Sequence, residues 1–334
     1  MADTGDELLK AWDAPQQSLD PLAEDFLYRD TNTCIYAAPG KGKSTVILNL
    51  LANLALGQPV FDQCPVPRPM RCFYLQLEGS PSETNQRFAL LRESYGLGVG
   101  DRWACDNLIC EFFEGINLLK QDTLDMLMDL ISGYIEADKP IDLIVVDPLY
   151  MAVVGAGMNK DETAQQAAQV WAKLRQAFNC AILFTHHSHR AKYGVDRKKI
   201  IEEDGDYYGS VYFQAALSGD WRLEQESKHQ ITLTNKKDRN SNLAAKFVLD
   251  YDAEYFRLRA AVETGKELSA LEKVKAVHNL LLKRGQNVTT FNEVLALSNV
   301  SAGRIRQLQL DSGFPQMFEV QKVKGRSSLW KVIT

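Results

Sequence analysis

The sequence is poor in the features that mark membrane, secreted or repetitive proteins. Among its 334 residues no apolar run reaches the roughly 18 needed to cross a bilayer, and there is no low-complexity tract or convincing internal repeat. The N-terminal stretch MADTGDELLKAWDAPQQ is acidic, unlike a signal or transit peptide. We therefore expect a cytoplasmic protein without a membrane partner.

Cysteine is also scarce, and its spacing argues against zinc ligands or disulfides. No two cysteines form a C-x-x-C pair, and three of them lie in the apolar, strand-like runs CIYAA, CFYLQL and CAILF. The six are Cys34, Cys64, Cys72, Cys105, Cys110 and Cys180. We expect buried, reduced thiols.

Positive charge is sparse overall but concentrated at one end. The net charge of −5 argues against a surface coated throughout by nucleic acid, yet residues 266–334 carry 11 Lys and Arg against 5 Asp and Glu. A chain of this length exceeds one ordinary hydrophobic core. An acidic body with a basic tail therefore indicates two domains with different functions.

The body reads as an α/β domain over residues 31–262. Residues 1–30 carry eight acidic residues against two basic ones and are expected to form a loosely structured lead-in. After them, short apolar strands (TCIYAA, CFYLQLE, LICEFF, IDLIVVD and CAILFTHH) alternate with helices expected over residues 44–57, 82–95, 123–136 and 163–178. That alternation is typical of a mostly parallel sheet covered by helices on both faces. WRLEQE, HQITLTNKK and AAKFVLDYD are expected to extend this sheet as antiparallel strands.

Residues 266–334 have a different pattern, with a boundary expected near residue 265. A helix over 270–284 is followed by the helical stretches TTFNEVLALS and SAGRIRQLQLDSG and by two strand-like runs, FEVQKV and SLWKVIT. Three helices ending in a hairpin predict a winged helix-turn-helix.

Residues 35–45, IYAAPGKGKST, predict a phosphate-binding loop between a strand and a helix. Backbone N–H groups at the helix start, a lysine for the β- and γ-phosphates and a hydroxyl for Mg²⁺ are the parts that such a loop requires. The expected ATP ligands are Pro39, Gly40, Lys41, Gly42, Lys43, Ser44 and Thr45. Ala37 stands where the motif has its outer glycine. Alanine at this position would destabilise the loop by about 1 kcal/mol only if the residue has to adopt a positive φ.

Two carboxylates follow strands of the expected sheet. Asp147 ends IDLIVVD, the Walker B arrangement, and is expected to support Mg²⁺ together with Ser44. Glu78 ends CFYLQLE and is expected to activate water. The alternatives are an ordinary capping Asp and a solvated Glu.

This placement of Glu78, on the strand after the first helix, resembles the RecA-like ATPases and among them the RepA-like hexameric helicases, relatives of the DnaB-like replicative helicases. The resemblance covers roughly residues 31–260. It implies that Arg87 lies near the nucleotide and that His186, or alternatively His187, senses the γ-phosphate in FTHHSHR. A solvated helix arginine is the alternative for Arg87, and an adjacent His pair alone does not indicate zinc.

TNKKDRNSN resembles the K-x-R motif that DnaB-like helicases insert into the neighbouring subunit's active site. The resemblance implies that Lys237 and Arg239 stabilise phosphate charge in trans, and hence a homo-oligomer, expected to be a hexamer. A polar hairpin turn is the alternative.

Two loops are expected to contact single-stranded DNA in such a ring. One is VVGAGMNKDE from residue 153; the other, from residue 189, combines Tyr193 with the cations Arg190, Lys192, Arg197, Lys198 and Lys199. The second loop also holds several acidic residues, so a solvated charged loop is the alternative.

The winged helix offers a second DNA contact, to duplex. Its recognition helix would present Arg304, Arg306 and Gln307, and its wing Lys322, Lys324 and Arg326. A protein-interaction winged helix is the alternative, although the basic balance favours nucleic acid.

These features together predict an ATP- and Mg²⁺-dependent DNA motor, a RepA-like ring-forming helicase or translocase. One alternative is a RecA-like recombinase that forms an open filament. Another, from a different class, is a DNA-binding regulator that ATP switches between conformations.

Overall fold

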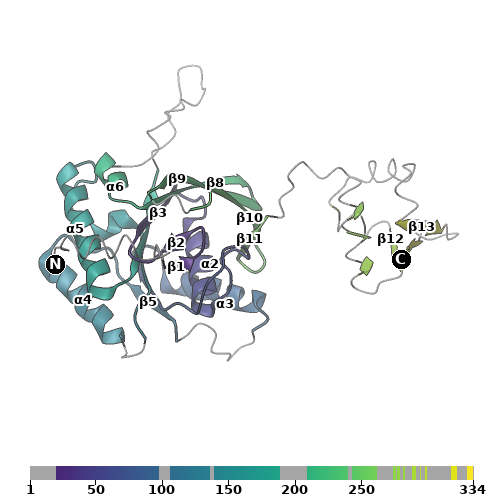
Figure 1. Ribbon diagram of the computed structural model, residues 1–334, viewed down its shortest axis with the longest axis horizontal. Helices are drawn as coiled ribbons and strands as arrows, with labels where there is room; N and C mark the ends of the chain where they lie inside the picture. The colour runs from purple at the N-terminus through teal and green to yellow at the C-terminus, as the bar shows by residue number, and fades with distance from the viewer. Residues whose placement is uncertain are drawn as a thin grey trace, which may run out of the picture. The chain divides into compact units, whose positions relative to one another are not determined.

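The chain divides into two compact units, Met1–Ala261 and Val262–Thr334. The computed structural model (Figure 1) describes residues 20–97, 106–135, 139–188, 209–239 and 243–261 of the first unit, and scattered positions between 274 and 333 of the second.

A nine-stranded sheet forms the centre of the first unit, in the order β11-β10-β9-β8-β3-β7-β6-β4-β5. The strands are β3 (Asn32–Ala37), β4 (Cys72–Gln76), β5 (Leu108–Phe112), β6 (Leu143–Asp147), β7 (Ala181–His187), β8 (Gly219–Ser227), β9 (Gln230–Asp238), β10 (Lys246–Asp252) and β11 (Arg257–Ala260). Strands from β8 to β5 run parallel, and β9, β10 and β11 continue the sheet antiparallel. The expected mixed α/β sheet is confirmed.

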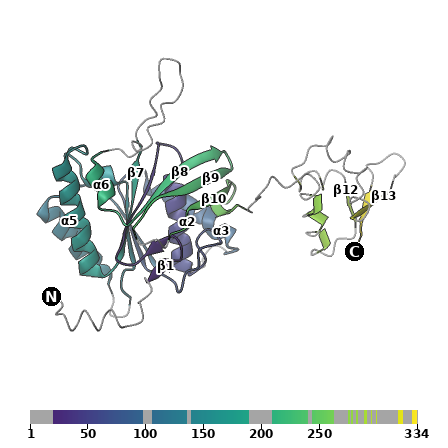
Figure 2. The same ribbon diagram turned by 45° about the horizontal axis from the view of Figure 1, so that its top comes forward.

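Helices cover both faces of this sheet, as Figures 1 and 2 show. The helices α2 (Lys43–Leu56) and α3 (Pro81–Ser94) pack on one face, and α4 (Gln121–Tyr134), α5 (Asp161–Phe178) and α6 (Val211–Ala215) on the other. Because side chains alternate along a strand, Ile35 and Ala37 of β3 join the first core while Cys34 and Tyr36 join the second. Both faces are thus buried, which explains the continuous apolar strands.

Several boundaries differ from the expectation by about two residues, as is usual at helix ends. Among the elements that were missed are α6 and β11, each of which is only four or five residues long and shows no periodicity. The expectation that WRLEQE begins an antiparallel extension was wrong for β8, which pairs parallel with β3; the reversal comes one strand later, at β9.

The acidic lead-in expected through residue 30 is wrong for residues 20–30. This segment forms β1 (Pro21–Ala23) and β2 (Leu27–Tyr28). Phe26 is fully buried and stacks on Trp221 of β8 with ring centroids 5.0 Å apart. Arg29 donates to Asp142, just before β6. Two strands of two and three residues are too short for a periodic signal, so the buried aromatic was not recognised.

The second unit contains a small three-stranded sheet in the order β12-β14-β13. Its strands are β12 (Val288–Thr290), β13 (Phe318–Gln321) and β14 (Leu329–Val332). Phe318 and Trp330 pack with helical residues between 274 and 294 in one hydrophobic cluster. The β13–β14 hairpin was expected, but the helix expected to begin at Thr289 was wrong there: Val288, Thr289 and Thr290 are β-branched and pair with β14.

Five of the six cysteines lie among the described residues and are free thiols. Burial raises the pKa of Cys64, Cys110 and Cys180 to about 12. The expected burial is found for Cys34, Cys64, Cys72 and Cys180, whereas Cys110 is only partly buried; Cys105 lies outside the described residues. No helix in the described part of the chain is long and apolar enough to cross a membrane.

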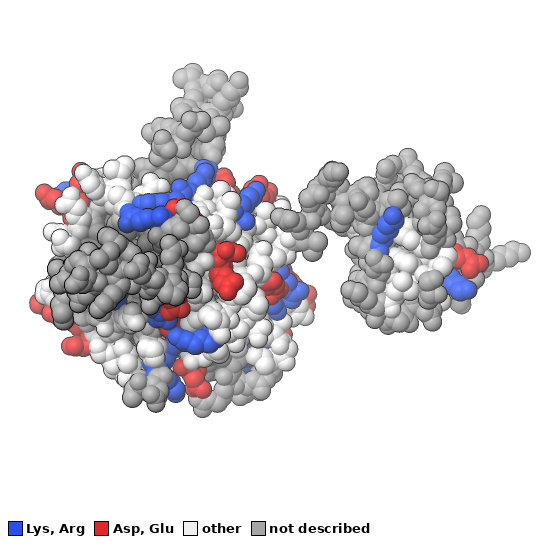
Figure 3. Space-filling view, in the orientation of Figure 1, with Lys and Arg blue, Asp and Glu red and all other residues white. Residues whose placement is uncertain are grey.

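Charges of both signs are interspersed on the face of the first unit that Figure 3 shows. Blue and red side chains alternate over short distances there.

Candidate nucleotide site

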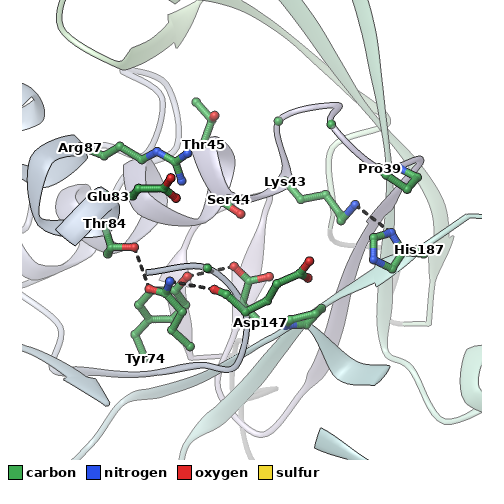
Figure 4. Close-up of a pocket in the computed structure, with 16 residues that line it drawn as sticks. Pro39, Lys43, Ser44, Thr45, Tyr74, Glu83, Thr84, Arg87, Asp147 and His187 are labelled. Carbon is green, nitrogen blue, oxygen red and sulfur yellow. Dashed lines mark hydrogen bonds between the residues drawn. The ribbon is translucent and has the colours of Figure 1, made fainter. Parts of the chain in front are cut away.

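A cavity of about 410 Å³ lies at the carboxyl ends of the parallel strands. Its walls come from the loop before α2, the ends of β4, β6 and β7, and the first turns of α3. Figure 4 shows Lys43 and Asp147 in the middle, Pro39 and His187 towards one end, and Arg87 and Glu83 towards the other. Ligands of open α/β sheets bind at this edge.

The loop between β3 and α2 has the backbone that phosphate binding requires. Gly40 and Gly42 have φ of 73° and 95°, values open to glycine but strained for other residues. Gly42 caps α2 without a side chain, and the first turn of α2 contains no acidic residue. The N–H groups at the start of α2 therefore face the cavity, where the helix dipole favours an anion.

Ala37 does not disturb this loop. It is the last residue of β3, paired in parallel register with His187 of β7, and is not among the residues with positive φ. The position that the motif usually gives to glycine is here extended strand, which any residue adopts. Alanine therefore costs no backbone strain.

Lys43 lies buried in the middle of the cavity. Its Nζ donates to the carbonyl oxygen of Ala37 at 3.1 Å and lies 3.3 Å from Nδ1 of His187. Burial lowers the pKa of Lys43, and the carboxylates of Asp147 and Glu78 act against that shift. The ammonium group thus lies where phosphate charge would compensate its burial.

Asp147 ends β6 and is only 7% exposed. Its Oδ2 accepts a hydrogen bond from the hydroxyl of Tyr74 at 2.9 Å, and its Oδ1 accepts one from Thr185. Burial raises the pKa of Asp147, while these two bonds and the charge of Lys43 act in the opposite direction. The side chain is fixed, and each oxygen retains a lone pair for a water of an ion's shell.

These residues suit Mg²⁺ held together with a nucleotide. Ser44 and Asp147 both line the cavity, and Mg²⁺ prefers one or two oxygen ligands from protein combined with phosphate oxygens and water. No group of three or more His, Cys, Asp or Glu side chains that could hold a metal ion occurs among the described residues. The site therefore fits a metal brought with phosphates better than a protein-only cage.

Glu78 lies on the exposed turn between β4 and α3 and lines the cavity. Its Oε2 accepts a hydrogen bond from the hydroxyl of Tyr150 at 3.0 Å. A second carboxylate, Glu83, also lines the cavity from the first turn of α3. Of these two glutamates, Glu78 is the one whose charge raises the pKa of Lys43.

Arg87 lines the same cavity, where α3 places it one turn beyond Glu83. Its guanidinium carbon lies 5.5 Å from the ring centroid of Phe256, in the turn before β11. Lys41, by contrast, is exposed and is not among the lining residues. Arg87 is therefore within the site, and Lys41 is at its rim.

The two histidines of FTHHSHR point to opposite faces of the sheet, as neighbours on a strand do. His187 lines the cavity and contacts Lys43. His186 is fully buried, and its ring lies 6.2 Å from the ring of Phe213 in α6. The structure thus brings the alternative, His187, to the site, and the first choice, His186, into the core.

Lys237 and Arg239 are not in this cavity. The Nζ of Lys237 donates to the carbonyl oxygens of Gln214 and Ala215, and the guanidinium of Arg239 donates to Ala215. Both cations thus hold the C-terminal end of α6, where carbonyl groups favour positive charge. Buried Asp220, paired with Lys237 across β8 and β9, lies beside them.

The cationic side chains expected to contact DNA lie outside the described residues. These are Arg190, Lys192, Arg197, Lys198 and Lys199 of the second loop, with Arg304, Arg306, Lys322, Lys324 and Arg326 of the second unit. The loop from residue 153 is described, and its Val153, Val154 and Met158 line a second, apolar cavity of about 680 Å³ that shares Pro39 and His187 with the first.

Sequence reasoning missed six lining residues, Tyr74, Gln76, Gly79, Glu83, Thr84 and Pro148. The first two carried a signal: they precede Glu78 by four and two residues, so the period of a strand puts all three on one face. Thr84 donates to Gln76, which in turn donates to the carbonyl oxygen of Glu78. This relay across β4 and α3 depends on their packing and has no local signal.

Comparisons with known proteins agree with this architecture. A family model described as an AAA domain matches residues 4–192. No curated protein matches the chain.

The chain is similar to many solved structures, of which two are described below. One is titled "The Structure Of A DnaB-Like Replicative Helicase And Its Interactions With Primase"; it is 14% identical, and the match covers 75% of this chain and 66% of that one with a TM-score of 0.51. The other is the crystal structure of the RadB recombinase, 13% identical over 70% of this chain and 91% of that one, with a TM-score of 0.46. The chain thus spans about two thirds of the helicase chain, and the likeness concerns the fold.

Proposed function

The chain belongs to the AAA domain family, whose model matches more than half of it, and from this premise we propose that it is an ATP-hydrolysing DNA motor that assembles as a ring. The observation that carries the ATPase part is the convergence of Lys43, Asp147 and Glu78 in one cavity at the start of α2. A lysine, a metal-supporting carboxylate and a candidate base are the groups that hydrolysis of a nucleoside triphosphate needs.

Each group has a role that its surroundings support. Lys43 and the N–H groups at the start of α2 bind the β- and γ-phosphates. Ser44 and Asp147 would hold Mg²⁺, which would neutralise phosphate charge when bound. Glu78 orients the attacking water and accepts its proton, and His187 contacts the γ-phosphate beside Lys43.

DNA is proposed as the partner on weaker grounds than ATP. The fold is similar to that of a DnaB-like replicative helicase. The loop that starts at residue 153 and the chain that leaves β7 after His187 both begin at the edge that carries the nucleotide cavity. Contact of single-stranded DNA with these loops would reach the nucleotide through His187, and the second unit would contact duplex.

The proposal of a ring depends on the action of Lys237 and Arg239 in trans. In this chain they hold α6 and do not reach the cavity of their own subunit. Action of these two cations on a nucleotide would therefore take place in the cavity of a neighbouring subunit. A head-to-tail interface of this kind closes into a ring or propagates as a filament, so the recombinase alternative differs in symmetry and not in chemistry.

Replacement of the two cavity carboxylates tests the ATPase assignment. Glu78→Gln should bind ATP but lose hydrolysis by about 100-fold or more, because glutamine cannot accept a proton. The matched control, Glu83→Gln, changes a carboxylate in the same cavity and should keep turnover within a few-fold. Loss of turnover in the Glu83 variant alone would contradict the assignment of Glu78.

Mixing of inactive variants tests the action in trans. Arg239→Ala subunits retain an intact cavity, and Glu78→Gln subunits retain Arg239. A mixture should recover turnover in the composite sites if Arg239 acts on a neighbour, and should recover none if it acts only within its own chain. Lys236→Ala, an exposed cation on the same strand, is the control and should behave like the unmodified protein.

A further inference from the structure

Tyr150 lies on the wall between the two cavities at the edge of the sheet. It belongs to the 3₁₀ helix η1 (Leu149–Ala152), which starts two residues after Asp147. Its ring lines the apolar cavity of about 680 Å³, and its hydroxyl donates to Oε2 of Glu78, which lines the nucleotide cavity. The Tyr150 side chain therefore contacts the candidate base, Glu78, and also lines the second cavity.

Glu78 depends on this contact for a defined position. Its main chain is fixed, because Gln76 donates to its carbonyl oxygen at 2.8 Å. Its carboxylate is exposed, and among the described residues Tyr150 provides the only hydrogen bond to it. A free glutamate side chain samples several rotamers, and a base that is displaced by about 1 Å loses much of its effect.

The Tyr150 ring is itself held in place. Its centroid lies 5.1 Å from that of His187, with an angle of 46° between the planes, and His187 contacts Lys43. Burial, followed by the hydrogen bond to Glu78, raises the pKa of Tyr150 to about 12. The hydroxyl therefore keeps its proton at any ordinary pH and stays a donor.

We propose that Tyr150 is a positioning residue for hydrolysis: its hydroxyl holds Oε2 of Glu78 so that Oε1 is left to accept the proton of the attacking water. This inference rests on the proposed role of Glu78. Tyr150 itself does not touch the reacting atoms. It places the base, and its own place is set by the ring contact with His187.

The test is Tyr150→Phe, which keeps the ring against His187 and removes only the hydroxyl. The turnover number for ATP should fall on the order of tenfold while KM stays within about twofold, because binding of ATP does not use Glu78. Trapping by ADP–aluminium fluoride, which mimics the transition state, should weaken by a similar factor while ADP affinity is unchanged.

Tyr134→Phe is the matched control, since the Tyr134 hydroxyl donates to Glu111 of β5 and neither residue lines the nucleotide cavity. It removes an equivalent Tyr–Glu bond and should leave the turnover number unchanged. Thermal unfolding of both variants separates a loss of position from a loss of fold. Tyr150→Phe with an unchanged turnover number, or with turnover and ADP affinity lost together, would overturn the inference.

The two proposals fail in different ways. If Glu78→Gln hydrolyses ATP at the normal rate, the role of Glu78 is wrong and the role of Tyr150 falls with it. If Glu78→Gln is inactive but Tyr150→Phe is fully active, the ATPase assignment stands and only the positioning role is wrong.

Discussion

Lys43 and His187 face each other across the nucleotide cavity, with Nζ of the first 3.3 Å from Nδ1 of the second. Burial lowers the pKa of His187, and the charge of Lys43 lowers it further. The ring is therefore neutral at pH 7 and accepts a hydrogen bond from the ammonium group. Phosphates that bind Lys43 would compete for this bond, which makes His187 the residue of β7 best placed to respond to the nucleotide.

We predict opposite effects for the two adjacent histidines. His187→Ala should keep its melting temperature and change ATP affinity by no more than a few-fold, but it should lose about tenfold of the stimulation of turnover by single-stranded DNA, because it removes the side chain proposed to contact the γ-phosphate at the end of β7. His186→Ala should lower the free energy of unfolding by about 2 kcal/mol, because His186 is buried against Phe213. Steady-state ATPase assays and thermal unfolding of both variants check this. Equal stimulation of His187→Ala and the unmodified protein would contradict it.

Asp147 should control the requirement for Mg²⁺. Asp147→Asn should lower turnover about 100-fold and raise the Mg²⁺ concentration needed for half of the remaining activity, and EDTA should abolish hydrolysis by the unmodified protein. Tyr74→Phe, which removes one donor to Asp147, should cost about 1 kcal/mol of stability and change turnover only a few-fold. Titration of activity with Mg²⁺ measures the turnover of each variant and the Mg²⁺ concentration that it requires. An unaltered Mg²⁺ requirement in Asp147→Asn would argue against a role in metal binding.

Restoring the glycine of the motif should bring no gain. Ala37→Gly should leave the turnover number within about twofold and lower the free energy of unfolding by about 1 kcal/mol, since glycine loses more conformational freedom in a strand. Gly42→Ala is the contrasting variant: with φ of 95° it should be strained and should weaken ATP binding. Binding of a fluorescent ATP analogue and chemical unfolding test the pair. Tighter binding by Ala37→Gly would mean that the alanine does disturb the loop.

Asp220 should make the fold less stable as the pH rises. Burial raises the pKa of this carboxyl to about 7, while the bond from Gln214 and the charge of Lys237 act in the other direction. The folded state therefore holds a proton that the unfolded state has lost between about pH 4 and pH 7. The stabilisation that comes from the raised pKa of Asp220 is therefore fully present below about pH 4 and is lost as the pH rises through about 7.

Asp220→Asn should remove this dependence. Relative to the unmodified protein it should gain about 2 kcal/mol between pH 5 and pH 8, measured by urea unfolding at both pH values. Glu226→Gln, an exposed residue of the same strand, is the control and should follow the unmodified protein. Parallel curves for Asp220→Asn and the unmodified protein would show that Asp220 is ionised in the fold at both pH values.

The parts of the molecule that local sequence determines were predicted. The helix after the phosphate loop was recognised from its apolar spacing, and its end at Gly57 is confirmed by a left-handed cap with φ of 66°. Lys43, Asp147 and Glu78 could be placed together because each follows a strand, and parallel strands bring their carboxyl ends to one edge.

The remaining features depend on contacts between distant residues. Phe26 is buried because Trp221 and Phe247 pack against it from β8 and β10, roughly 200 residues away in sequence. Choosing His187 over His186 required knowledge of which face of β7 lines the cavity. The hydroxyl that holds Glu78 belongs to Tyr150, which lies 72 residues later in the sequence. Neither a period nor a motif reports such pairings, which arise only when the sheet is assembled.

The most direct test of the central claim is the steady-state ATPase rate with and without single-stranded DNA, with Lys43→Ala as the blank. The account predicts hydrolysis that single strands stimulate strongly, and none in Lys43→Ala. This variant should remain folded because the truncation removes an ammonium group whose burial is itself unfavourable. Unchanged turnover in Lys43→Ala would contradict the nucleotide site itself. A low rate that is indifferent to single strands would contradict the motor and favour the ATP-switched regulator.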